Sequence, residues 1–403
     1  MDFNLIRSLL NKKADGKIVL LVMDGLGGLP MEADGKTELE AANTPNMDAL
    51  AAKSMLGLHE GIRPGITPGS GPAHLSLFGY DPLKYVVGRG ALEGLGIDFE
   101  FKDSDVAVRG NFCTVDQNGL IIDRRAGRIP TDISVRLCKL LSENVKIPGV
   151  EVFFQAVKEY RFLLVVRGDG LKANIQETDP QAVGLKPLPA LALDDDSKKA
   201  AEIVQEVIRQ SEEILANESP ANMFMLRGWA QLPDWPKFPD ALNLKACAIA
   251  MYPMYRGVAK LVGMESLPAA QSYEEEFEML ENRWNDYDFF FLHIKKTDSY
   301  GEDGNFEKKV NEIEAVDALL PRILALNPDV LIITGDHSTP SAMKQHSWHP
   351  VPVLFYGKTC RPDGIASFGE RACRQGGLGV RFPAYELMSL AMAHAGRLEK
   401  FGA

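Results

Sequence analysis

Four continuous apolar runs constrain the fold of this chain more than any other feature. Their sequences are KIVLLVMDG (17–25), YDFFFLHI (287–294), DVLIITGDH (329–337) and PVPVLFYG (350–357). Strands with one solvated face alternate apolar and polar residues, whereas a parallel strand covered on both faces is apolar throughout. The runs therefore predict buried strands of a mostly parallel sheet.

Helical segments accompany these strands. TPNMDALAAKSM (44–55) predicts a helix with Thr44 as N-cap and Pro45 at the first helical position. The segment 305–326 predicts a second helix, between the second and third apolar runs. Alternation of strand and helix at both ends of the chain indicates an α/β domain with a mostly parallel sheet flanked by helices.

The middle of the 403-residue chain has a different pattern. Shorter strand-like segments, at 150–157 and 161–168, accompany one strong helix that begins in the acidic run 194–197. Acidic residues at a helix start interact favourably with the helix dipole. We therefore expect a smaller α+β domain inserted into the α/β domain. The expected boundaries are 1–90 and 240–403 for the α/β domain and 91–239 for the insert.

The composition excludes several classes of protein. The formal net charge of −11 argues against general binding of nucleic acid or of a membrane surface. No apolar run approaches the roughly 20 residues that a membrane helix needs, and the N-terminus does not resemble a signal peptide. The five cysteines are scattered and form no CxxC pair, which indicates reduced thiols and a cytoplasmic location.

Acidic and histidine side chains follow three of the predicted strands. In open α/β sheets, ligands bind beyond the carboxyl ends of the strands. Each side chain alone has an ordinary structural role, but together they favour a two-metal site, because Asp, Glu and His bind hydrolytic divalent metals. The side chains are Asp24 after the first strand, Asp298, Glu302 and Asp303 after the strand that ends near His293, and Asp336, His337, His346 and His349 after the third.

Ser70 lies in the loop sequence ITPGSGPAHLSLFGYDP (66–82), between two glycines and two prolines. The loop is neither a nucleophile elbow nor a P-loop, because the required glycines and the Gly-Lys-Ser/Thr are missing. One interpretation is a helix start with Ser70 as N-cap. Beside a two-metal site, however, the hydroxyl could serve as a nucleophile whose pKa a metal lowers.

Six motifs occur in order along the chain: MDGLGG, TPNMDAL, TPGSGPAHLSLFGYDP, HIKKTD-x-x-G-x-DG, TGDHSTP and HSWHPVPVLFYG. This set resembles the alkaline phosphatase superfamily and, within it, the archaeal-type cofactor-independent (2,3-bisphosphoglycerate-independent) phosphoglycerate mutases. The resemblance covers nearly the whole chain and includes DRRAGRI, RGDGLKANIQETDP and YRGVAKLVGM in the middle. It implies an alkaline-phosphatase-like α/β domain and an inserted domain for substrate binding and phosphotransfer.

The resemblance implies a role for each matched residue. Ser70 would be the nucleophile that takes the phosphoryl group and returns it. One metal ion would be held by Asp24, Ser70, Asp336 and His337, and the other by Asp298, Glu302 and His346. The phosphate and carboxylate of the substrate would be bound by Arg124, Arg125, Arg128, Arg161, Arg227 and Lys260. Guanidinium groups suit both anions.

Two positions depart from the family pattern. Glu302 stands where the motif D-x-x-x-H-D-G has histidine, and His349 stands where aspartate usually precedes PVP. The departures imply either a re-tuned metal site or a weakened activity.

The implied reaction is the interconversion of 2- and 3-phosphoglycerate through a phosphoserine, without 2,3-bisphosphoglycerate. Manganese is the expected metal, with magnesium, cobalt and zinc as alternatives, and the partner is a small phosphorylated three-carbon acid. The inserted domain would close over the site and exclude water. Two other functions stay open: a metal-dependent phosphatase or phosphonate hydrolase, and a non-catalytic phosphometabolite binder. The oligomeric state also stays open.

Overall fold

The computed structural model describes residues 1–33 and 35–402. The chain forms two compact units. Unit 1 comprises Met1–Val86 together with the segment that begins at Trp235, and unit 2 comprises Val87–Asp234. No helix in these described ranges is long and apolar enough to cross a membrane.

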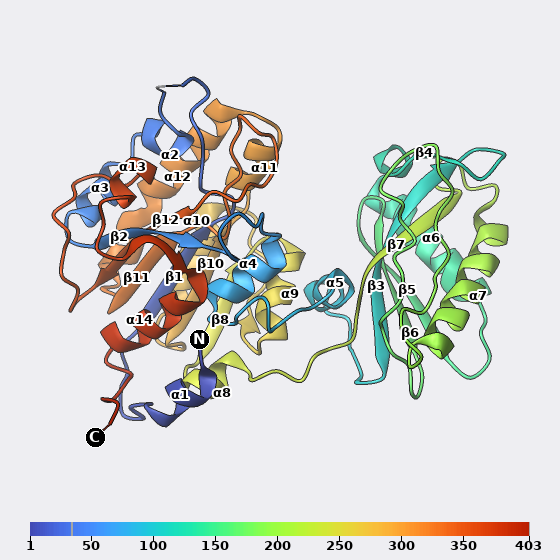
Figure 1. Ribbon diagram of the computed structural model, residues 1–403, viewed down its shortest axis with the longest axis horizontal. Helices are drawn as coiled ribbons and strands as arrows, with labels where there is room; N and C mark the ends of the chain where they lie inside the picture. Colours follow the sequence, from blue (N-terminus) through green and yellow to red (C-terminus); the bar gives the residue numbers. More distant parts are fainter. Residues whose placement is uncertain (34, 403) are drawn as a thin grey trace. The chain divides into compact units, whose positions relative to one another are not determined.

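Unit 1 is built on one eight-stranded sheet with the order β13-β2-β12-β11-β1-β10-β8-β9 (Figure 1). β1 is parallel to β10 and β11, and β8 is parallel to β10 and β9. β13 is also parallel to β2. Only β12 is antiparallel to its neighbours, β11 and β2, and the sheet of the described residues is therefore mostly parallel. The strands are β1 (Ile18–Met23), β2 (Met55–Glu60), β8 (Ala246–Ala250), β9 (Glu265–Ser266), β10 (Phe289–Ile294), β11 (Val330–Thr334), β12 (Val351–Gly357) and β13 (Gly379–Pro383).

Helices cover both faces of this sheet, which is why its central strands are apolar throughout. On one face, side chains of α3, α10 and α12 pack against alternate residues of β1, such as Val19 and Leu21. On the other face, Phe78 at the end of α4 packs edge-on against Phe291 of β10. The helices of unit 1 are α1 (Phe3–Ser8), α2 (Glu38–Ala41), α3 (Pro45–Ala51), α4 (Ser70–Leu77), α8 (Phe238–Leu242), α9 (Pro253–Leu261), α10 (Tyr273–Asn282), α11 (Lys296–Glu302), α12 (Phe306–Ala325), α13 (Glu370–Cys373), η2 (Ala384–Glu386) and α14 (Leu387–His394).

The structure confirms the predicted α/β class and corrects one element. The four apolar runs form β1, β10, β11 and β12, and the helix predicted over 305–326 is α12, for which Asn305 is the N-cap. The helix expected over 44–55 ends at Ala51, because Met55 begins the buried strand β2. Only the length of the predicted helix was wrong. An apolar segment as short as the one that follows Ala51 fits the 3.6-residue repeat of a helix as well as the two-residue repeat of a strand.

Unit 2 is an antiparallel sheet in which β3 pairs with β4, β6 and β7, and β6 pairs with β5. α6 and α7 pack on one face over a large apolar core, and α5 lies on the other (Figure 1). The elements are α5 (Arg89–Gly96), β3 (Asp105–Val115), β4 (Ile121–Asp123), η1 (Ala126–Arg128), α6 (Thr131–Asn144), β5 (Glu151–Lys158), β6 (Arg161–Arg167), α7 (Lys198–Leu215) and β7 (Met223–Ala230).

Candidate active site

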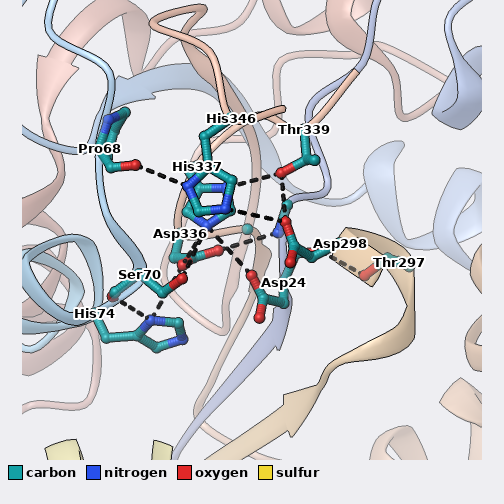
Figure 2. Close-up of polar contacts among 12 residues, drawn as sticks. Asp24, Pro68, Ser70, His74, Thr297, Asp298, Asp336, His337, Thr339 and His346 are labelled. Atoms are coloured by element: carbon teal, nitrogen blue, oxygen red, sulfur yellow. Dashed lines mark hydrogen bonds and ion pairs between the residues drawn. The ribbon is translucent and has the colours of Figure 1, made fainter. Parts of the chain in front are cut away.

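The carboxyl ends of β1, β10 and β11 meet at one edge of the unit 1 sheet. Met23 pairs with Ile294, and Val22 pairs with Thr334, so the loops that follow these strands start side by side. Figure 2 shows the side chains that these loops deliver, together with Ser70 at the start of α4.

A first cluster contains Asp24, Asp336 and His337, whose ligand atoms all lie within 4.8 Å of one another. All three side chains are fully buried. The Nε2 atom of His337 lies 3.4 Å from Asp24 Oδ1, 3.1 Å from Asp336 Oδ2 and 3.3 Å from the Oγ atom of Ser70. The structure thus brings together the four residues that the sequence groups around the first metal.

A second cluster contains Asp298, His337 and His346. The Nε2 atom of His346 lies 3.5 Å from Asp298 Oδ1, and the two imidazole rings stack with centroids 3.7 Å apart. Glu302 lies at the rim: its Oε1 is 3.7 Å from His346 Nε2, and its side chain is 54% exposed. His337 therefore belongs to both clusters, whereas the sequence assigned it to one.

Hydrogen bonds orient both imidazoles. Thr339 donates its hydroxyl proton to Asp298 Oδ1 (2.6 Å) and therefore accepts from His337 Nδ1 at 3.0 Å. Likewise, the Nδ1 atom of His346 lies 2.9 Å from the carbonyl of Pro68, to which it donates. Each ring is thereby held in the tautomer whose bare Nε2 faces the cluster, as in metal-binding histidines. Burial also lowers the pKa of His337, which favours its neutral form.

The two carboxylate oxygens of Asp24 have different surroundings. Oδ2 accepts hydrogen bonds from the hydroxyl of Tyr255 and from Lys295 Nζ, which lies 3.0 Å away and also binds Asp298. Although burial opposes ionisation, the charge of Lys295 holds the pKa of Asp24 well below its ordinary value. Within the described ranges, Asp24 Oδ1 and Asp336 Oδ2 are buried and accept no hydrogen bond.

These buried oxygens fit a pair of divalent cations. A buried carboxylate oxygen without a donor is costly, and a cation between such oxygens and bare imidazole nitrogens removes the cost. Mixed carboxylate and imidazole donors are a common set for hydrolytic divalent metals.

Ser70 is held at the edge of the first cluster by its own helix. It is the first residue of α4, with Gly69 rather than Ser70 as N-cap, and it is only 7% exposed. His74, one turn later, lies with its Nδ1 2.8 Å from the Ser70 carbonyl and 3.2 Å from Asp336 Oδ2. The serine hydroxyl therefore points to the ligands, while its carbonyl faces His74 (Figure 2).

Sequence reasoning missed several residues of this site. Thr339, Tyr255, Lys295 and His74 each contact a predicted ligand or the backbone of Ser70. Lys295 and Thr339 lie within the HIKKTD and TGDHSTP motifs, so position in a motif was an available signal. Tyr255 lies in α9 and begins the segment YRGVAKLVGM, which the family resemblance includes.

Unit 2 holds the predicted arginines. Arg124 binds Asp179 at 2.7 Å, and Arg227 lies 3.3 Å from Glu177 and 3.6 Å from Asp179. Arg161 lies over the ring of Tyr160. The two remaining predicted arginines, Arg125 and Arg128, are exposed around the short helix η1.

The sheet of unit 2 joins two of these arginines to Arg109, which the sequence analysis missed. Arg109 pairs with Arg227 across β3 and β7, and its neighbour Asn111 pairs with Arg161 across β3 and β6, so these side chains share one face. Arg109 is buried, and its Nε has no hydrogen-bond partner in the described part of the chain. Burial and the nearby Arg89 lower its pKa, although Glu93 opposes this. We call Arg89, Arg109, Arg161 and Arg227 the arginine cluster.

Two further predicted residues, Lys260 and His349, belong to unit 1. Lys260 lies near the C-terminal end of α9, whose first turn carries Tyr255. His349, the second departure from the family pattern, lies with its Nδ1 2.9 Å from the hydroxyl of Ser347 and is in neither metal cluster of the described residues.

Comparison with known proteins gives a consistent picture. The family model of 2,3-bisphosphoglycerate-independent phosphoglycerate mutase matches residues 51–222. The chain is 54% identical to a probable 2,3-bisphosphoglycerate-independent phosphoglycerate mutase from Thermotoga petrophila, over 96% of each chain. It is 50% identical to the corresponding probable enzyme from Thermus thermophilus, over 100% of each chain.

Solved structures agree. A protein from Pyrococcus horikoshii superposes with a TM-score of 0.82 at 30% identity, over 97% of this chain and 100% of that one. The cofactor-independent phosphoglycerate mutase from Thermoplasma acidophilum superposes with a TM-score of 0.69 at 28% identity, over 94% of this chain and 100% of that one. These findings confirm the resemblance inferred from the six motifs.

Proposed function

The chain belongs to the 2,3-bisphosphoglycerate-independent phosphoglycerate mutase family, whose members interconvert 2- and 3-phosphoglycerate, and we propose that it does so through a phosphoserine at Ser70. The observation that carries this proposal is the position of the serine hydroxyl, 3.3 Å from His337 Nε2 at the edge of two adjoining ligand clusters. A lone serine without a neighbouring base is a weak nucleophile, and metal ions held by these two clusters would activate it.

The transfer has two matched halves. In the first, the Ser70 oxygen bonds to phosphorus while the bond from phosphorus to the substrate oxygen breaks, and the serine proton passes to the glycerate oxygen. In the second, the other hydroxyl of glycerate attacks the phosphoserine, and the serine regains a proton. Because Ser70 is only 7% exposed, few water molecules can compete with glycerate for the phosphoserine.

Two divalent metal ions fit the site. Asp24, Ser70, Asp336 and His337 would hold one, and Asp298 and His346, with Glu302 at the rim, would hold the other. When bound, such ions supply positive charge that stabilises the serine oxygen and the transferring phosphoryl group. Tyr255 and Lys295 hold one oxygen of Asp24, so that its other oxygen stays turned toward the ligands. We propose manganese as the metal, because hard carboxylate oxygens make up much of the donor set.

We propose that the arginine cluster of unit 2, with Arg124, Arg125 and Arg128, binds the phosphate and carboxylate of the substrate. Glu93, Glu177 and Asp179 lie near these arginines and hold part of the set in place. Guanidinium groups form paired, charge-assisted hydrogen bonds to both anions. A role for Lys260, a division of the chain at residues 90 and 240, and a cytoplasmic location stay predictions.

Product analysis tests the proposed function. The purified enzyme is incubated with 3-phosphoglycerate and Mn²⁺, and the mixture is followed by phosphorus and proton NMR. Accumulation of 2-phosphoglycerate, with a Ser70 phosphopeptide after acid quenching, supports the mutase. Free phosphate in place of 2-phosphoglycerate would identify a phosphatase, and an unchanged substrate would identify a binder.

A further inference from the structure

Lys309 is a fully buried lysine that the proposed chemistry does not use. It belongs to α12, and its ammonium donates to three main-chain carbonyls: those of Gly25 at 2.9 Å, Gly27 at 3.1 Å and Thr339 at 2.9 Å. An ammonium has three N–H donors, so these carbonyls use all of them.

The three carbonyls belong to two loops that carry metal ligands. Gly25 and Gly27 follow Asp24, and Thr339 follows Asp336 and His337. The Thr339 hydroxyl in turn contacts Asp298 and His337. The two loops also bond each other directly, because the Thr339 amide donates to the carbonyls of Gly27 (3.0 Å) and Gly25 (3.2 Å). Lys309 adds a link from α12 to the same backbone segments, on which both ligand clusters depend.

Charge explains why this position holds a lysine. The Oε1 atom of Glu38, also buried, lies 3.8 Å from Lys309 Nζ and accepts a hydrogen bond from the amide of Ser341 in the second loop. Burial lowers the pKa of Lys309, and the charge of Glu38 opposes this. An apolar side chain would leave the buried Thr339 carbonyl without a donor among the described residues and would leave Glu38 without its neighbouring positive charge.

We propose that Lys309 is a positioning residue that sets the metal affinity of both clusters by holding the two ligand loops together. The inference rests on the proposed two-metal function. Groups that orient metal ligands through hydrogen bonds change metal affinity by about 10–100-fold when removed.

Metal titration of the full chain tests the proposal. Protein freed of metal with a chelator is titrated with Mn²⁺ by calorimetry, and free Mn²⁺ is counted by electron paramagnetic resonance. Lys309→Met is combined with Glu38→Gln, so that no unpaired charge stays buried, and Glu38→Gln alone is the reference. Lys309→Gln, which keeps N–H donors without charge, is measured in parallel.

Lys17 supplies a matched control. Its ammonium also donates to main-chain carbonyls, those of Trp284 (2.8 Å) and Tyr287 (2.7 Å), but it precedes β1, at the opposite end of that strand from Asp24. Lys17→Met is expected to lower the melting temperature and leave Mn²⁺ binding unchanged.

The expected result is a rise of about 10–100-fold in the Mn²⁺ Kd at both sites of the double variant, with an intermediate rise for Lys309→Gln. The kcat at limiting Mn²⁺ falls, while the KM for 3-phosphoglycerate stays unchanged. Unchanged Mn²⁺ affinity in both Lys309 variants overturns this inference alone. A wild-type chain that binds no Mn²⁺ overturns the proposed function as well.

Discussion

The two polar sites of this protein are built in opposite ways. In unit 1, Asp24 and Asp336 are completely buried, and each has one oxygen held by donors of the protein. In unit 2, Arg227 is 31% exposed and lies 3.3 Å from Glu177 and 3.6 Å from Asp179. The first site is buried and preorganised for a demanding coordination geometry, whereas the second combines the buried Arg109 with partly exposed arginines that pair with acidic residues.

Ser70→Ala tests the first half of this comparison and has the largest expected effect. Removal of a nucleophile is expected to lower kcat by about three powers of ten or more, because the nearby hydroxyls of Thr339 and Tyr255 already donate to Asp298 and Asp24. The melting temperature should stay close to that of the wild type. Turnover is measured by a coupled enolase assay; activity near the wild-type level would rule out the phosphoserine.

Arg109→Met tests the second half. Loss of a charge-assisted hydrogen bond is expected to cost about 1.5–3 kcal/mol, which is roughly 10–100-fold in kcat/KM for 3-phosphoglycerate. Most of the loss should appear in KM, because the residue binds an anion that is present throughout the reaction. Arg136→Met, which removes an exposed arginine paired with Glu218, is the control. Equal kinetics in the two variants would refute a binding role for Arg109.

Tyr255→Phe tests whether the Tyr255 hydroxyl orients the Asp24 carboxylate in unit 1. The variant loses the hydroxyl that binds Asp24 Oδ2, so the carboxylate is less well oriented. We expect a Kd for Mn²⁺ about tenfold higher and a similar fall in kcat at limiting metal. Tyr80→Phe removes another hydroxyl, one that donates to the Pro236 carbonyl, and should leave metal binding unchanged. Identical titration curves for Tyr255→Phe and the wild type would contradict the orienting role.

Glu302→His is expected to have a smaller effect, on metal preference. Glu302 lies 3.7 Å from His346 at the exposed rim, so a histidine there adds a softer donor to the second cluster. Relative activation by cobalt and zinc, against manganese and magnesium, should rise by a few-fold. The measurement is a series of metal-free samples reconstituted with each ion. A metal profile that does not move shows that Glu302 is not a ligand.

Glu276→Gln should leave activity at neutral pH unchanged and alter stability only. Glu276 in α10 is buried, and neither of its carboxylate oxygens has a hydrogen-bond partner among the described residues. Burial raises its pKa from 4.5 to about 9, so the folded state binds a proton that the unfolded state releases between these values. Its contribution to stability is therefore complete below about pH 4.5 and is lost as the pH rises toward 9.

Glutamine cannot ionise, so the Glu276→Gln variant should lose this pH dependence. We expect its melting temperature to exceed that of the wild type by a few degrees at pH 8, with little difference at pH 5. Differential scanning calorimetry across this range is the measurement. Parallel pH profiles for the two proteins would contradict a buried neutral carboxyl.

The sequence by itself determined the α/β class, the central strands and the chemical types of the metal ligands. These are local signals: a continuous apolar run predicts a strand buried on both faces, and Asp24 or His337 directly follows such a run. Only the tertiary structure decided which groups hold the ligands, because Tyr255, Thr339 and Lys309 meet loops far away in the sequence. The same holds for Arg109. Its strand sequence does not show that arginines lie beside it, and only the pairing of β3 with β6 and β7 brings it near Arg161 and Arg227. What lies opposite a residue depends on which strands become neighbours, and β3 pairs with β6 and β7, which are far away in the sequence.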